Sequence, residues 1–187
     1  MNTDVINILK NGGLGVIPTD TIYGVVGFSL NSETVEKIYK LRKRSSDKPF
    51  IILVSQISDL EKFEVKSTEK QKEFLEENWP NPLSVVLSCS SEKWEYLHRG
   101  TQSLAFRMPN NKKLLDLLKQ TGSLVAPSAN FEGEKPAENI AEAKKYFGDS
   151  VDFYIDEGSI FTTASTLIEL KLDGNYKILR KGSFRIG

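Results

Sequence analysis

Short apolar runs alternate with amphipathic stretches along this chain. Short apolar runs that are typical of strands, several of them buried on both faces, cover residues 14–17, 50–54, 84–87, 104–106, 124–126, 153–155, 166–170 and 177–179. Apolar residues recur at helical spacing over 32–42, 68–77, 112–120 and 140–147, which predicts helices there. These elements interleave without the strict strand-helix-strand rhythm of a doubly wound sheet. We therefore expect an α/β (α+β) fold, with a twisted mixed β-sheet flanked by helices.

No repeat, low-complexity tract or Gly/Ser/Pro-rich linker divides the 187 residues, so the sequence predicts a single domain over residues 1–187. The helix at 140–147 carries sharp end signals, because Asn139 and Glu142 have capping-box spacing and Gly148 follows the last turn.

The sequence also predicts a cytoplasmic protein without a membrane segment. Its longest aliphatic and aromatic run, Phe50–Val54, has five residues, whereas a spanning helix needs about 20. Residues 1–10 have neither the basic segment nor the apolar segment of a secretory signal peptide. One cysteine, Cys89, and one histidine, His98, exclude an internal disulfide and the usual Cys/His zinc sites.

Charge is balanced overall but concentrated locally. The 25 Lys and Arg residues equal the 25 Asp and Glu residues, which argues against nucleic-acid binding through global charge. Five cations and one carboxylate fall within residues 40–48. Arg42 and Arg44 could clamp a polyphosphate through paired hydrogen bonds. The alternative is a solvated helix end whose cations complement the helix dipole.

Polar side chains gather where predicted strands end. Thr19-Asp20-Thr21 follows the first strand and forms either a polar pocket or a turn in which Asp20 bonds nearby backbone. Arg107 ends another strand, where it could bind a substrate carboxylate or lie on the surface. Ser128 could bind a ligand or form a local turn, but it lies outside a GxSxG nucleophile elbow. The chain also lacks a P-loop and a GxGxxG motif.

The order of these motifs carries more information than any one of them. In sequence they are Thr19–Gly24, Arg42–Arg44, Asp47–Pro49, Trp79–Leu83, Phe106–Pro109, Pro127–Asn130, Ser165–Thr166 and Leu179–Gly182. Over residues 10 to 183 this order resembles the YrdC family of L-threonylcarbamoyladenylate synthases, in its single-domain form.

The resemblance implies a YrdC-like fold with a central concave pocket. It also implies that L-threonine, bicarbonate or CO2, and ATP give threonylcarbamoyl-AMP and pyrophosphate. A separate threonylcarbamoyl transferase complex would use the product to form N6-threonylcarbamoyladenosine next to the anticodon of tRNA. Mg²⁺ would arrive with ATP, and the resemblance assigns neither a metal site on the protein nor a covalent or acid-base catalytic residue.

Site residues follow from the resemblance position by position. Those implied for L-threonine are Thr21, Arg107, Ala126 and Ser165. Those implied for ATP are Arg42, Arg44, Lys48, Ser103, Ser128, Asn130 and Arg180.

This sequence departs from the family pattern at three places. Arg42-Lys43-Arg44 stands for a Lys-x-Arg pair, so either Arg42 or Lys43 replaces the lysine. Lys48 stands where asparagine is common, and Leu53 where a histidine often lies.

Two other functions remain open on the sequence. A non-catalytic module could bind double-stranded RNA or tRNA through the same basic stretch, and weak RNA binding could also accompany catalysis. Alternatively, the domain could use carbamoyl phosphate and form carbamoyl-AMP.

Overall fold

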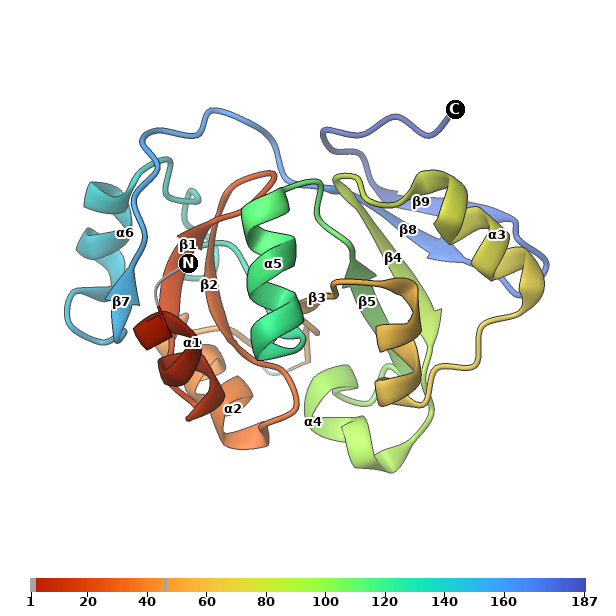
Figure 1. Ribbon diagram of the computed structural model, residues 1–187, viewed down its shortest axis with the longest axis horizontal. Coiled ribbons are helices and arrows are strands. Elements are labelled where there is room, and N and C mark those ends of the chain that lie inside the picture. The colour runs from red at the N-terminus through yellow and green to blue at the C-terminus, as the bar shows by residue number, and fades with distance from the viewer. Residues whose placement is uncertain (1–2, 46) are drawn as a thin grey trace.

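The computed structural model describes residues 3–45 and 47–187, and these build one mixed β-sheet covered by helices (Figure 1). The nine strands run in the order β7-β1-β2-β6-β3-β5-β4-β8-β9 within the described residues. Their bounds are β1 Gly15–Pro18, β2 Tyr23–Phe28, β3 Ile51–Leu53, β4 Leu83–Ser88, β5 Ser103–Arg107, β6 Leu124–Val125, β7 Phe153–Tyr154, β8 Thr166–Leu170 and β9 Tyr176–Arg180.

Pairing in the sheet is both parallel and antiparallel. The pairs β1–β7, β3–β5 and β4–β8 are parallel, and the other neighbours are antiparallel. The predicted mixed sheet flanked by helices is confirmed. The helices are α1 Thr3–Lys10, α2 Ser32–Leu41, α3 Glu69–Asn78, α4 Glu95–His98, α5 Lys112–Thr121 and α6 Ile140–Phe147, with short 3-10 turns η1 Ile57–Phe63 and η2 Glu92–Trp94.

Strand β2 and helix α1 lie where the hydrophobic pattern predicts no element. In β2, Gly24 and Gly27 interrupt the apolar run, yet all but the last of its residues are buried. Helix α1 holds its place with Val5 and Leu9, which are spaced one turn apart and are buried in the same hydrophobic cluster as Leu114. Tertiary packing therefore decides both elements.

Helix α6 begins at a half-formed capping box. The Asn139 side chain accepts a hydrogen bond from the Glu142 N–H at 2.9 Å, as predicted. The Glu142 carboxylate, however, accepts from the Glu138 N–H and not from that of Asn139. The helix ends as predicted at Gly148, whose φ is 48°.

The part of the sheet formed by β1, β2, β6 and β3 is buried on both faces. Val16 and Val25 join the larger core cluster, whereas their chain neighbours Ile17 and Val26 pack in a second cluster with α1 and α5. Figure 1 shows α1 and α5 lying over this part, and α3 beside β8 and β9. Helix α5 contributes Leu114, and two further leucines one turn on, to the second cluster.

Toward the other end, the sheet is covered on one face only. Leu104 and Phe106 of β5 enter the larger core, where the Phe106 ring meets Phe63 edge-on at 5.2 Å. Ala105 of β5 and Leu167 of β8 alternate with buried neighbours and are only partly buried. Because side chains alternate along a strand, these residues share the uncovered face. That face supplies the floor of a concavity.

Among the described residues, every helix is too short and too polar to cross a lipid bilayer.

Gly27 determines how closely α2 approaches the sheet. A Cβ atom on Gly27 would lie 2.6 Å from Thr34 Cγ2 and 3.0 Å from Ile38 Cδ1, both on α2. We predict that Gly27→Ala lowers the free energy of unfolding by about 1–3 kcal/mol, because the added methyl overpacks this contact. Urea denaturation measures the change. Lys177→Ala on exposed β9 serves as control and should stay within about 0.5 kcal/mol. Equal stabilities for both variants would contradict the close packing.

Candidate functional site

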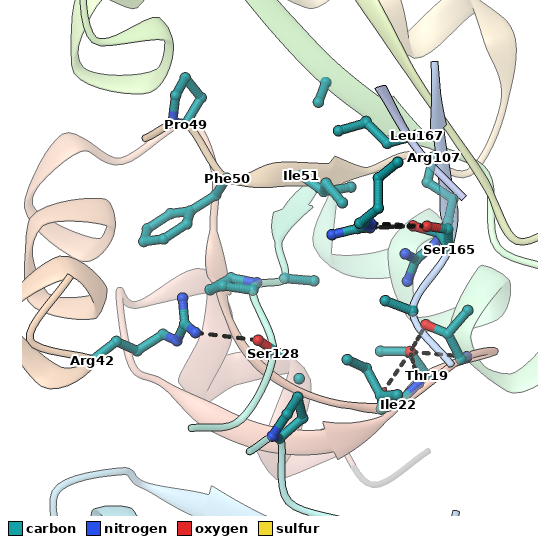
Figure 2. A pocket seen from close by; sticks show the side chains of 18 of the residues that line it. Thr19, Ile22, Arg42, Pro49, Phe50, Ile51, Arg107, Ser128, Ser165 and Leu167 are labelled. Atoms are coloured by element: carbon teal, nitrogen blue, oxygen red, sulfur yellow. Dashed lines mark hydrogen bonds between the residues drawn. The ribbon is translucent and has the colours of Figure 1, made fainter. Parts of the chain in front are cut away.

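A cavity of about 300 Å³ opens over the uncovered face of the sheet (Figure 2). Its walls come from the loop after β1, the loop before β3, the segment after β6 and the chain on either side of β8 and β9. Four arginines line it, Arg42, Arg44, Arg107 and Arg180, and no Asp or Glu is among the described lining residues. Such a lining suits a small anionic ligand.

Arg180 binds Ser165 inside the cavity. Arg180 donates to the Ser165 backbone oxygen at 2.9 Å and contacts Ser165 Oγ at 3.2 Å. Ser165 Oγ in turn lies 2.8 Å from Ser84 Oγ on β4. Burial lowers the pKa of Arg107; Asp20 opposes this effect and Arg180 adds to it. Burial also lowers the pKa of Arg180.

The loop from β1 to β2 places the Thr21 hydroxyl in the same cavity. Thr19 Oγ1 donates to the Ile22 oxygen at 2.7 Å and accepts from the backbone N–H groups of Thr21 and Ile22. These bonds form a tight turn that fixes Thr21, whose Oγ1 lies 3.1 Å from that of Thr19. Asp20 does not bond its own turn; it accepts from the Asn110 N–H at 3.2 Å. The loop therefore lines the cavity and also forms a turn, but Thr19 makes the bonds of that turn, and not Asp20, to which the sequence interpretation assigns them.

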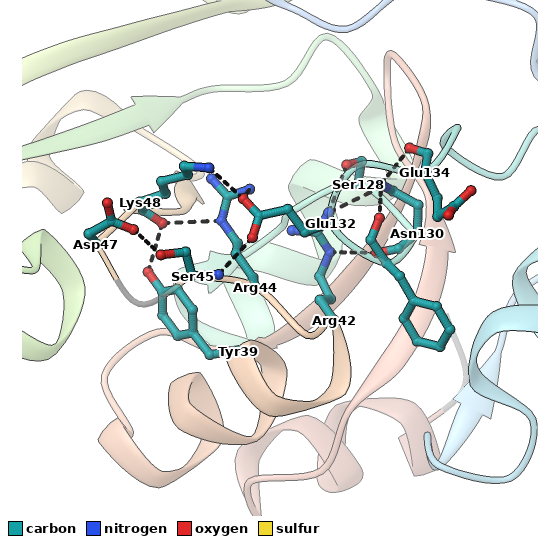
Figure 3. A network of polar contacts seen from close by, with 11 residues as sticks. Tyr39, Arg42, Arg44, Ser45, Asp47, Lys48, Ser128, Asn130, Glu132 and Glu134 are labelled. Atoms are coloured by element: carbon teal, nitrogen blue, oxygen red, sulfur yellow. Dashed lines mark hydrogen bonds and ion pairs between the residues drawn. The ribbon is translucent and has the colours of Figure 1, made fainter.

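On the opposite side of the cavity, Arg42 leaves the end of α2 and is 3% exposed. Its Nε donates to the Asn130 backbone oxygen at 3.0 Å, and its Nη2 contacts Ser128 Oγ and Asn130 Oδ1, each at 3.2 Å (Figure 3). Burial lowers the pKa of Arg42 to about 10; Arg44 adds to the effect and Glu132 opposes it. Arg42 thus holds the segment after β6 against α2.

Glu132 organises the basic loop beside this wall, although no local pattern in the sequence indicates it. Its carboxylate accepts from Lys48 Nζ and from the Ser45 N–H, both at 2.7 Å, and lies 4.0 Å from Arg44 Nη1 (Figure 3). Lys48 lowers the pKa of Glu132, mainly through this hydrogen bond. Lys48 therefore faces a carboxylate from a segment far away in sequence.

The structure brings most of the predicted site residues together. The predicted residues that belong to the cavity lining are Thr21, Arg42, Arg44, Arg107, Ala126, Ser128, Ser165 and Arg180. Figure 2 shows Arg107 and Ser165 on one side, and Arg42 and Ser128 on the other. Their ligand roles stay predictions.

Three predicted residues do not line the cavity. Asn130 lies behind Arg42, and Lys48 lies beside Arg44 on Glu132. Ser103 lines a separate hollow. Ser103 shares a strand face with Arg107, but it lies four positions earlier in the strand, a distance of about 13 Å. Ala105, between them, lines the main cavity instead.

The structure shows where the residues that depart from the family pattern lie. Arg42 reaches the cavity, whereas the Lys43 ammonium lies over the Phe131 ring at 4.2 Å, so Arg42 is the one of the two that faces the cavity. Leu53 is fully buried in the cluster with α1 and α5, and Ile51 lines the cavity in its vicinity.

The site is thus a mixed sheet with arginines and hydroxyls gathered over one bare face, a lining that suits small anionic ligands. The Sua5/YciO/YrdC family model, described as telomere recombination, matches residues 7–182. The chain belongs to this family.

Relatives and solved structures agree with that assignment. The threonylcarbamoyl-AMP synthase of Bacillus subtilis is 34% identical over 137 residues, 72% of this chain and 39% of the relative. That of Idiomarina loihiensis is 29% identical over 150 residues, 79% of this chain and 81% of the relative. A crystal structure of Pyrococcus abyssi Sua5 complexed with L-threonine has a TM-score of 0.84 at 28% identity, covering 96% of this chain and 53% of that one. The chain therefore spans about half or less of the longer relatives.

Arg42 gives a direct test of this wall. We predict that Arg42→Lys lowers the free energy of unfolding by about 2 kcal/mol, because one ammonium cannot replace hydrogen bonds from a buried guanidinium to several oxygens. Urea denaturation measures the loss, and Lys40→Arg, at an exposed position on the same helix, is the matched control. A variant as stable as the parent protein would mean that these contacts contribute no net stability.

Proposed function

We propose that the protein is a threonylcarbamoyl-AMP synthase, which forms threonylcarbamoyl-AMP and pyrophosphate from L-threonine, CO2 or bicarbonate, and ATP. One observation carries the proposal: a single cavity is lined by Arg107 on one side and by Arg42 on the other, together with Arg44. Such a cavity offers cations both to an amino-acid carboxylate and to a polyphosphate. The names of the relatives, and the L-threonine bound to the similar Pyrococcus protein, support it.

L-Threonine binds, in this proposal, beside Arg107. The guanidinium takes the amino-acid carboxylate, and the hydroxyls of Thr21 and Ser165 are the nearby hydrogen-bonding groups. Ala126 adds a small apolar wall. Because Arg107 is 4% exposed, its interaction with a carboxylate is weakly screened by water.

ATP binds toward Arg42, Arg44 and Ser128. The amine nitrogen of threonine first attacks CO2 and loses a proton, which gives a carbamate. A carbamate oxygen then attacks the α-phosphorus, and the bond to the β-phosphate breaks to release pyrophosphate. The described lining contains no Cys, His, Asp, Glu or Lys. Positioning and charge neutralisation by arginine, without a covalent protein intermediate, therefore provide the catalysis.

Mg²⁺ enters, in this proposal, as part of the nucleotide. Magnesium prefers oxygen ligands, above all carboxylates and phosphates. The described lining offers hydroxyls but no carboxylate, and the described residues hold no cluster of three potential metal ligands. The protein residues do not by themselves form a magnesium site, so the triphosphate supplies the charged ligands.

We further propose that the protein works in the cytoplasm. Its labile product passes to a separate transferase complex, which places the threonylcarbamoyl group on tRNA next to the anticodon. Weak contact with tRNA through the basic loop is part of this proposal.

Pyrophosphate release tests the proposal. Purified protein with ATP and Mg²⁺ should release pyrophosphate only when both L-threonine and bicarbonate are present. Release that ignores either one would exclude the synthase. Formation of AMP derivatives from carbamoyl phosphate without threonine would favour the carbamoyl-transfer alternative. RNA affinity that falls steeply with salt and ignores threonine, without turnover, would favour the RNA-binding module.

Arg44 should serve the nucleotide more than the amino acid. We predict that Arg44→Ala raises the KM for ATP by about tenfold, because a charge-assisted hydrogen bond to phosphate is lost. The KM for threonine should change by less than about twofold, since Arg107 holds the carboxylate. Steady-state pyrophosphate assays with Lys40→Ala as control give both constants. Equal effects on both substrates would show that Arg44 only supports the fold.

A further inference from the structure

Asp20 is a buried carboxylate behind the cavity to which no role has been assigned. Its side chain is 2% exposed, and its Oδ1 lies 3.2 Å from Arg107 Nη2. The other oxygen, Oδ2, accepts from the Asn110 N–H at 3.2 Å. Asp20 is absent from the cavity lining, whereas Arg107 and Thr21 belong to it. Arg107 therefore stands between Asp20 and any bound ligand.

The guanidinium of Arg107 is only partly satisfied. Its side chain is 5% exposed, and its Nε is buried without a hydrogen-bond partner. Asp20 Oδ1 pairs with Nη2 by charge, but neither that oxygen nor Arg107 Nε makes a hydrogen bond. A guanidinium with unused hydrogen-bonding capacity attracts a carboxylate, which can accept parallel N–H bonds from it. Arg107, which lines the cavity, is thus suited to a carboxylate ligand.

The positive charge around Arg107 explains why a carboxylate lies beside this arginine. Arg180 lies close enough to Arg107 to lower its pKa, and both line the same cavity. Asp20 offsets part of this positive charge through its ion pair with Arg107, and no carboxylate is among the described lining residues. One anion against two cations leaves a net positive charge, which the carboxylate of an amino acid would neutralise.

We propose that Asp20 is a positioning residue for substrate: it orients Arg107 so that the guanidinium receives the carboxylate of L-threonine. This inference rests on the proposed function. The Thr19 turn holds Asp20 and Thr21 at adjacent positions, so one loop presents a hydroxyl to the ligand and a carboxylate to the arginine that binds it.

Asp20→Asn tests the inference, because it removes the charge and keeps an oxygen that can accept from the Asn110 N–H. We expect the KM and the Kd for L-threonine to rise at least tenfold, whereas the KM for ATP changes less than twofold and kcat less than threefold. Asp20→Glu should recover part of the threonine affinity. The matched control is Asp116→Asn, the same chemical change on the exposed face of α5.

L-Threoninol, which lacks the carboxylate, separates positioning from a merely structural role. Calorimetry on the parent protein should show much tighter binding of L-threonine than of L-threoninol, and Asp20→Asn should reduce this preference at least fivefold. A lower melting temperature with an unchanged preference would overturn the inference while leaving the synthase intact. A parent protein that binds no threonine and releases no pyrophosphate would instead remove the proposed function, and the inference with it.

Discussion

The main physical constraint on this structure is that several guanidinium groups lie in one partly buried cavity. Removing a cation from water is costly unless a counter-charge or hydrogen bonds replace the hydration. Each arginine meets this need differently. Asp20 stands behind Arg107, the Ser165 oxygens accept from Arg180, and Ser128 and Asn130 accept from Arg42. Glu132 lies beside Arg44. These partners fix the arginines before a ligand arrives, which limits the ordering that binding requires.

The sheet makes this arrangement possible because its two ends are covered differently. Where α1 and α5 lie over β1 and β2, both faces of the sheet are apolar and buried. Where β5, β4 and β8 continue the sheet, only the face toward Phe63 and Phe106 is covered. Loops that leave the end buried on both faces help to line the cavity over the bare face of the other end. Binding side chains from distant segments therefore converge without a helix between them and the ligand.

How much of this can be predicted from the sequence depends on whether a signal is local. Strand Thr166–Leu170 is mostly apolar and includes the β-branched Thr166 and Ile168, and its predicted bounds are the observed ones. Strand β2 escapes prediction, because Gly27 weakens the pattern for a reason that lies in α2. The order of motifs indicates Thr21, Arg107 and Ser165 together. It assigns no role to the partners Asp20 and Glu132, because their cations lie far away in sequence and only folding pairs them.

Zero net charge acquires a specific meaning in this structure. A basic face for an extended nucleic acid would leave its cations exposed and unpaired. Here two of the cavity cations, Arg107 and Arg44, have a carboxylate behind or beside them, and neither carboxylate belongs to the described lining. The cavity interior stays positive while the protein as a whole is neutral. Such a field acts over a short range in salt, so it selects compact anions that enter the cavity over long polymers that pass across it.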